Sequence, residues 1–215
     1  MRVVIAGGHG KIALLLTARL RERGDEVVSL IRNPDHAGDI RAAGAEPVVC
    51  DLESATPQQI ADAVSAAEQV VFAAGAGPGS GNARKLTMDR DGAIKTLQAA
   101  TLLGADRFLI VSSVGTEDPP DGDDTFSVYL RAKAEADAAV MAGDLQWTVL
   151  RPGALTDDPA TDRVRLSEEP FRGRVPRDDV AASIAALLAT PAAVGKVLYV
   201  NGGEQSIEQS LRELS

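Results

Sequence analysis

Tyr129 and Lys133 stand four residues apart in the stretch Tyr129-Leu-Arg-Ala-Lys133, within a segment of helical periodicity. Side chains at positions i and i+4 share one face of a helix, so we expect the phenol and the ammonium to lie together. A nearby ammonium favours the phenolate. Ser112 and Ser113, at the end of an earlier apolar run, add a hydroxyl that can hydrogen-bond a carbonyl or an alcohol. These groups can move a proton on and off oxygen while a hydride moves at carbon. The alternative is a tyrosine packed on a sheet beside a solvated lysine.

A second chemical feature is the glycine turn at residues 6–13, AGGHGKIA, which follows an apolar run and opens a helical pattern. Counted from Gly7 the spacing is G-x-x-G-x-x-A. Glycine permits the tight turn and the approach of a pyrophosphate, and Ala13 lets the helix lie close to the sheet. Main-chain N–H groups at the helix start then face the anion. The pattern predicts a dinucleotide site at residues 7–12 (Gly7, Gly8, His9, Gly10, Lys11 and Ile12). The alternative is a tight turn that binds nothing.

The end of the second predicted strand bears on which dinucleotide binds. A carboxylate there would hold a ribose 2′-hydroxyl, but Asp25 and Glu26 lie at the opposite end of the strand. Arg32 instead offers a planar guanidinium to a 2′-phosphate, and Lys11 adds charge. NADP(H) is therefore favoured over NAD(H). Asp51 and Leu52, after the third strand, are weaker candidates for the adenine.

The elements that must position these residues alternate between short apolar runs and helical patterns. This order predicts an α/β fold of the Rossmann type: a doubly wound parallel sheet in a three-layer α/β/α arrangement, with a small C-terminal segment on the substrate side. Expected strands are Arg2–Ala6, Glu26–Ile31, Pro47–Cys50, Gln69–Ala73, Arg107–Ser112, Gln146–Leu150 and Lys196–Val200. Expected helices are Lys11–Arg23, Pro57–Ala66, Thr87–Leu103, Val128–Met141 and Arg177–Ala189.

Two stretches interrupt this alternation, the glycine-rich residues 74–84 and the charged, proline-bearing residues 153–175. Both follow predicted strand ends, where open α/β sheets bind ligands. We expect them to be irregular segments beside the substrate, together with residues 114–125, and to be either flaps or neutral linkers. Arg84, Arg151 and Arg163 could meet an anionic substrate, although solvated arginines are the simpler expectation. The 215 residues predict one domain, with 153–175 as its substrate-side loop region.

Composition limits the partners. A net charge of −9 repels phosphate backbones and anionic lipid, so neither nucleic acid nor a membrane is expected as a partner. One cysteine and two histidines argue against a disulfide or a metal site. The apolar N-terminal run is too short for a signal peptide, and no stretch is long enough to span a bilayer. We expect a cytoplasmic protein, monomeric or homodimeric, that acts on a small molecule.

The chain resembles the short-chain dehydrogenase/reductase superfamily, in its atypical NAD(P)-binding, epimerase-like or NmrA-like group. The matching stretches, which extend over nearly the whole chain, are AGGHGKIA, IRNP, CDL, VFAAG, Asp89-Arg-Asp-Gly92-Ala, FLIVSSVG, YLRAK, LRPG, VPRDDVA and YVNGG. The resemblance implies residue roles. Residues Gly7, His9, Gly10, Lys11 and Ile12 hold the pyrophosphate, Arg32 the 2′-phosphate, Asp51 and Leu52 the adenine, and Ala73, Ala74 and Gly75 the adenosine ribose side.

For the reaction, the resemblance implies Tyr129 as acid/base and Lys133 on the nicotinamide ribose. Ser113, or Ser112 if the alignment shifts by one, orients the substrate, and Pro152 lies beside the nicotinamide. Two departures stand out. Asp89 occupies the place of an asparagine found in many relatives, and the short segment after Pro152 argues for a small substrate.

Three functions fit these residues. The first is an NADP(H)-dependent oxidoreductase, or an epimerase using transient oxidation, with Tyr129 as acid/base. The second is a regulator that senses the redox state of the cofactor without chemistry. The third is a flavin or quinone reductase in which Tyr129 matters little. The presence of both Tyr129 and Lys133 favours the first.

Overall fold

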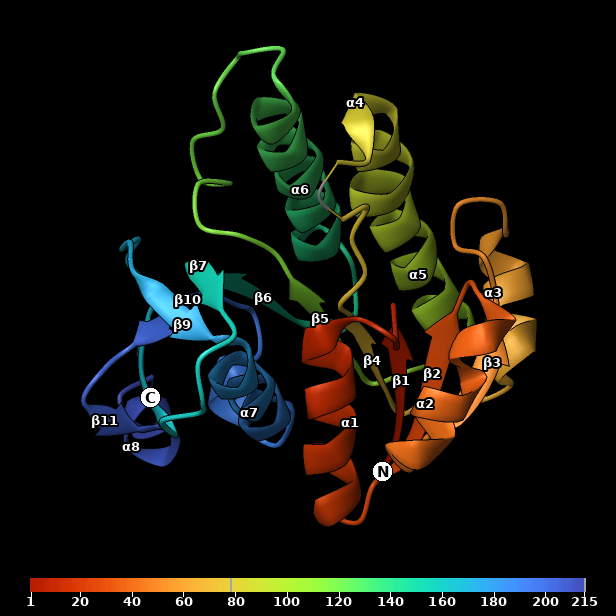
Figure 1. The fold of residues 1–215 in the computed structure, drawn as a ribbon, viewed down its shortest axis with the longest axis horizontal. Coiled ribbons are helices and arrows are strands. Elements are labelled where there is room, and N and C mark those ends of the chain that lie inside the picture. The colour runs from red at the N-terminus through yellow and green to blue at the C-terminus, as the bar shows by residue number, and fades with distance from the viewer. Residues whose placement is uncertain (78, 215) are drawn as a thin grey trace.

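The structure, a computed structural model, describes residues 1–77 and 79–214. Its main sheet contains nine strands within that part of the chain, in the order β3-β2-β1-β4-β5-β6-β10-β8-β11 (Figure 1). Their bounds are β1 Arg2–Ala6, β2 Glu26–Ile31, β3 Glu46–Val49, β4 Gln69–Phe72, β5 Arg107–Val111, β6 Gln146–Pro152, β8 Arg163–Ser167, β10 Lys196–Gly202 and β11 Gln205–Ser206. The strands from β3 to β10 in this order pair in parallel, whereas β8 and β11 form an antiparallel edge.

Helices cover both faces of the sheet (Figure 1). One face carries α1 (Lys11–Glu22), α2 (Ala37–Ala42) and α7 (Arg177–Leu188), and the other carries α3 (Pro57–Val64), α5 (Asp91–Leu102) and α6 (Thr125–Met141). Alternate side chains of β1 supply the two cores: Val3 and Ile5 pack toward the α1 face, and Val4 and Ala6 toward the α5 face. Shorter elements are η1 (Pro34–His36), α4 (Gly81–Arg84), η2 (Lys85–Arg90), η3 (Pro191–Ala193) and α8 (Ile207–Arg212).

The predicted Rossmann-type fold is confirmed, and each expected strand and helix has an observed counterpart. Half of the element ends coincide with the predicted ones and nearly all the others differ by one to three residues, because helix and strand ends are the least determined part of a sequence pattern. In α6, for example, Asp124 caps the helix by accepting from the N–H groups of Phe126 and Ser127, which moves the start to Thr125. Within the described residues, no helix has the length and apolar character needed to cross a bilayer.

The expectation of irregular structure across residues 153–175 is wrong. This stretch contains β7 (Ala154–Thr156) and β8, and β9 (Arg174–Pro176) begins at its end. Strands β7 and β9 pair in parallel as a separate two-stranded sheet, and β8 joins the main sheet beside β10. Alternation in β8 places Val164 and Leu166 inside and its arginines outside, which is the period-two pattern of a strand with one exposed face. The charged residues on its exposed face obscured that pattern.

The helix expected over Thr87–Leu103 also differs. Helical structure begins at Gly81 with α4, passes through the π-helical turn η2, and becomes α-helical only at Asp91. The helix thus takes in the end of the glycine-rich stretch that was expected to be irregular. A π-helical turn inserts one residue into the α-helical repeat and often occurs at functional sites. Here it buries Lys85, Met88 and Asp89.

Candidate functional site

Two cavities lie along the carboxyl edge of the parallel strands, and they share Ala73, Ala74 and Gly75 after β4. The first cavity, of about 260 Å³, is lined by Gly7, His9, Gly10, Leu30, Ile31, Arg32, Asn33, His36, Cys50, Leu52, Arg84 and Met88 in addition. The second, of about 520 Å³, is lined by Ile12, Gly77, Gly79, Lys85, Asp89, Val111, Ser112, Thr125, Phe126, Tyr129, Lys133 and Leu155 in addition. The crevice outside β1 and β4 is where the strand order reverses, the usual ligand position in such sheets.

The glycine turn between β1 and α1 packs directly against its neighbours. Gly7 has a φ of +82°, and a Cβ there would lie 2.5 Å from the Cα of Ala74. Gly8 donates its N–H to the carbonyl of Leu30 at 2.9 Å, and a Cβ on it would lie 2.4 Å from the Cβ of Ser29. Both positions therefore require glycine, Gly7 for its conformation and Gly8 for its contact with β2.

The start of α1 has the features that a diphosphate needs. Gly10 is the N-cap residue, with no side-chain cap and no acidic residue in the first turn. The first N–H groups of a helix have no partner within it. Gly10 lines the first cavity and Ile12 the second, so these amides lie where the two cavities meet. A dinucleotide whose diphosphate bound here would have one half in each cavity, which fits the expected cofactor.

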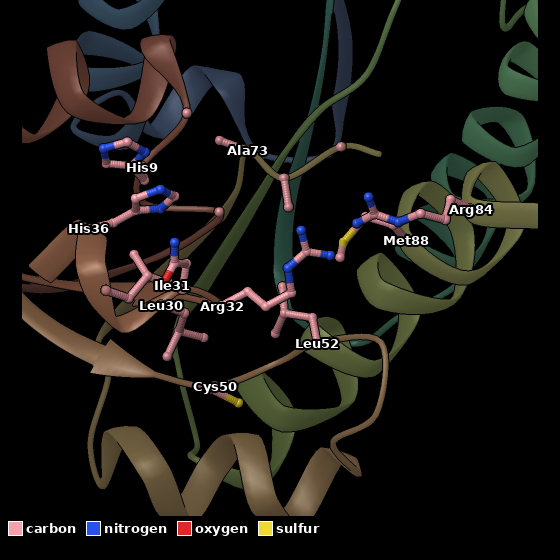
Figure 2. Close-up of a pocket in the computed structure, with 15 residues that line it drawn as sticks. His9, Leu30, Ile31, Arg32, His36, Cys50, Leu52, Ala73, Arg84 and Met88 are labelled. Carbon is pink, nitrogen blue, oxygen red and sulfur yellow. The ribbon is translucent and has the colours of Figure 1, made fainter. Parts of the chain in front are cut away.

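Arg32 and Arg84 point toward each other across the first cavity (Figure 2). Both contact Glu53, with Arg32 Nη1 at 3.3 Å and Arg84 Nη2 at 2.8 Å from Oε2. Partial burial acts against ionisation of Glu53, but hydrogen bonds from Thr87 and Arg84 and the charges of both arginines hold its pKa below the usual range. The two guanidiniums form a cationic pair balanced by one carboxylate.

Only some of the other residues expected at the cofactor line this cavity. Leu52 lines the cavity. The Asp51 side chain instead bonds the local main chain, with its Oδ1 accepting from the N–H of Glu53 at 3.0 Å. His9 stacks on His36 with ring centroids 3.6 Å apart and also contacts Asp39 (Figure 2). Lys11 extends to Asp157 at 2.6 Å, with 68% of its side chain exposed.

Tyr129 and Lys133 both line the second cavity, as expected for two side chains on the same face of α6. The Lys133 ammonium is buried, donates to the carbonyl of Val111 at 2.7 Å, and lies 5.9 Å from the centroid of the Tyr129 ring. The ring of Phe72 lies at the same distance from this ammonium. Phe126, 62% exposed, stacks beside Tyr129 with centroids 6.0 Å apart. Pro152 ends β6, where its carbonyl accepts from Val114.

The two serines differ in position. Ser112 lines the second cavity and donates to the buried Oδ2 of Asp137 at 2.8 Å, whereas the Ser113 hydroxyl donates to the carbonyl of Val114. Burial raises the pKa of Asp137, against the opposing effects of Ser112 and Arg151. Asp137 lies one helical turn beyond Lys133, so the face of α6 continues from the cavity into the interior.

Arg151, expected to be solvated or to meet a substrate, is buried. Its Nη2 lies 3.1 Å from Oδ2 of Asp137 and its Nη1 donates to the Tyr199 hydroxyl at 2.7 Å. It thus balances a buried carboxylate, as a buried charge requires. Arg163 lies on β8 and hydrogen-bonds the carbonyl of Glu204.

Lys85 and Met88 were not predicted to lie at the site, whereas Asp89 was singled out as a departure from the resembled family. Lys85 and Asp89 enter the second cavity from η2, and Met88 on the same turn lines the first. Lys85 lies before the helix that was predicted to start at Thr87, so the sequence pattern gave no expectation for its side chain. Asn33 directly follows Arg32 in the matching stretch IRNP, which was an available signal for it, whereas His36 lies two residues beyond that stretch.

The sequence matches the NAD(P)H-binding family over residues 7–191. The chain belongs to this family. A curated relative, the uncharacterized sugar epimerase YhfK of Bacillus subtilis, is 31% identical over all of both chains. A reductase from Streptomyces, 3-diazoavenalumate denitrifying reductase, is 30% identical over 91% of this chain and 70% of its own length. A solved structure from Bacillus halodurans, named as an NAD-dependent epimerase/dehydratase, superposes with a TM-score of 0.92 at 36% identity and 99% coverage of both chains.

These likenesses confirm the expected membership in the atypical, NAD(P)-binding short-chain dehydrogenase/reductases. The family match begins at Gly7, the first glycine of the turn that joins the two cavities.

Proposed function

We propose that this NAD(P)H-binding protein is an NADP(H)-dependent oxidoreductase, or an epimerase using transient oxidation, that acts on a small carbonyl or alcohol with Tyr129 as acid/base. The observation that supports this most strongly is the junction of the two cavities at the start of α1. One side carries the arginine pair, and the other carries Tyr129 and Lys133.

In this proposal residues 7–12 and the amides of α1 hold the diphosphate, and Arg32 and Arg84 hold the 2′-phosphate. Lys133 holds the nicotinamide ribose. A nicotinamide held there would supply or accept the hydride at the reacting carbon. In reduction, Tyr129 gives its hydroxyl proton to the substrate oxygen as the C=O bond becomes a C–O bond, and water then restores the proton. The Lys133 ammonium, held by Val111, stabilises the phenolate left behind.

The cofactor preference can be tested at Arg32. Because Glu53 balances the arginine pair, we propose that a 2′-phosphate replaces Glu53 as the partner of Arg32. Arg32→Ser should weaken NADPH binding about 10- to 100-fold and change NADH binding less than threefold, since a charged hydrogen bond is worth about 1.5–3 kcal/mol. Fluorescence titration with both nucleotides measures the ratio.

Glu53→Gln is the companion variant, because it removes the competing carboxylate and keeps the arginines. It should tighten NADPH binding and leave NADH binding nearly unchanged. Equal weakening of both nucleotides by Arg32→Ser would contradict the assignment of Arg32 to the 2′-phosphate.

The two serines provide a second test. Because the Ser112 hydrogen is directed at Asp137, its oxygen remains to accept from a substrate or tyrosine hydroxyl. Ser112→Ala should lower kcat/KM about 10- to 100-fold. Ser113→Ala should change it less than threefold, because that hydroxyl is used by Val114. The opposite ranking in steady-state kinetics would assign the substrate contact to Ser113.

A further inference from the structure

Lys85 is a buried cation in the second cavity that the proposed reaction does not use. Only 7% of the residue is exposed, and its ammonium donates to the carbonyl of Gly77 at 2.8 Å. It also lies 5.4 Å from the centroid of the Tyr129 ring. An ammonium has three N–H donors, so the bond to Gly77 leaves two for a molecule in the cavity that Lys85 lines.

The charge around Lys85 is unbalanced. The cavity holds two ammonium groups, Lys85 and Lys133, against one carboxylate, Asp89. In the described part of the chain, neither lysine forms an ion pair with a carboxylate within 4 Å. Burial raises the pKa of Asp89 despite Lys133, the amide of Ala76 and Lys85. Since a buried ammonium is costly unless it is paired, the cavity favours an anionic occupant.

Lys85 reaches the cavity from the first position of the π-helical turn η2. Lys85 and Asp89 both enter the second cavity from η2, while Met88 on the same turn lines the first. The two basic residues of the second cavity therefore come from different elements, Lys133 from α6 and Lys85 from η2. With Lys133 assigned to the cofactor ribose and to Tyr129, Lys85 is the cation that remains for the substrate.

The rest of the lining is apolar and partly aromatic. Ile12, Val111 and Leu155 contribute aliphatic surface, and Phe126 extends the ring of Tyr129 with an interplanar angle of 28°. An aromatic side chain that is 62% exposed at a cavity can pack against a flat ring. The cavity thus combines a surface for a planar group with a buried positive charge.

We propose that the substrate is an organic acid, a planar aromatic or conjugated carbonyl compound (or the corresponding alcohol) whose carboxylate pairs with Lys85 while its reacting oxygen faces Tyr129. This inference rests on the proposed function, because it takes the second cavity as the place where the substrate reacts. Lys85 is then the residue that selects acids over neutral analogues of the same shape.

The test compares 4-formylbenzoate with its methyl ester as substrates, with NADPH as the reductant. The unmodified protein should show a kcat/KM for the acid at least about tenfold above that for the ester. Lys85→Met, which keeps the buried stem, should bring the ratio near one, and Lys85→Arg should keep most of the preference for the acid. Lys196→Met, at the start of β10 and paired with Glu168, is the matched control and should change nothing.

A binding measurement separates this inference from the proposed function. Calorimetric titration of 4-formylbenzoate into the complex with NADP⁺ should show binding that Lys85→Met weakens about tenfold, whether or not turnover occurs. Lys85-dependent binding without turnover would support the acid subsite and contradict the oxidoreductase. Equal binding and turnover of acid and ester, unaffected by Lys85→Met, would overturn the inference, as would no binding of the acid.

Discussion

Tyr129→Phe should bind NADPH as tightly as the unmodified protein does and lose about 100- to 10,000-fold in kcat. The phenyl ring keeps its contacts with Phe126 and the two ammonium groups, so the cavity retains its shape. Only the hydroxyl is removed, and general acid/base catalysis typically raises the rate by about 100- to 10,000-fold. Single-turnover reduction of 4-formylbenzoate, followed by the loss of NADPH absorbance, measures the effect on the chemical step.

Phe126→Ala is the control for the ring environment. It removes the exposed neighbour of Tyr129 without touching the hydroxyl, and should change kcat less than about tenfold. Unchanged turnover in Tyr129→Phe, with quinones or flavins as better acceptors than carbonyls, would favour a flavin or quinone reductase instead. NADPH binding with no turnover of carbonyls, quinones or flavins by the unmodified protein would favour a redox sensor.

Gly10→Val should lower NADPH affinity at least about 100-fold without unfolding the protein. The φ of Gly10 is −65°, which any residue can adopt, and a Cβ there would meet only the carbonyls of Gly7 at 3.2 Å and Ala73 at 3.8 Å. The valine side chain would instead enter the cavity at the start of α1, where we propose that the diphosphate binds. Losing contacts to several main-chain amides costs more than losing one side-chain hydrogen bond.

Gly38→Ala provides the matched control, because it lies on α2, has no neighbour within 4 Å, and does not line either cavity. Equilibrium titration with NADPH, together with thermal unfolding of each variant, separates loss of the site from loss of the fold. Wild-type affinity in Gly10→Val would mean that the dinucleotide does not lie against this turn.

The strands could be predicted from the sequence where their residue pattern matches their burial in the folded protein. Buried parallel strands are nearly continuous runs of Val, Ile and Leu, so β1, β2, β4 and β5 were identified directly. Strand β8 was missed because its outer face is charged, and β7 because three residues carry too little pattern. The Tyr129–Lys133 pair followed from helical spacing alone.

The site could be predicted only in part, because much of it depends on tertiary contacts. Arg32 was expected at the cavity, but its ion pair with Glu53, which also pairs with Arg84, brings together three separate segments of the chain. Asp51 was expected at the adenine, yet its carboxylate caps the local turn. Lys85 lies in η2, before the start of the helix that the sequence pattern predicted. The period of a helix or strand determines which side chains share a face. Which charged side chains pair with each other across different elements depends on the folded structure.

The proposed position of the cofactor, a nicotinamide dinucleotide that bridges the two cavities across the start of α1, can be tested by titrating the unmodified protein with NADPH and following the fluorescence of the nicotinamide. We expect saturable binding at one site per chain, with micromolar or tighter affinity and weaker binding of NADH. No saturable binding of either nucleotide would contradict the proposal.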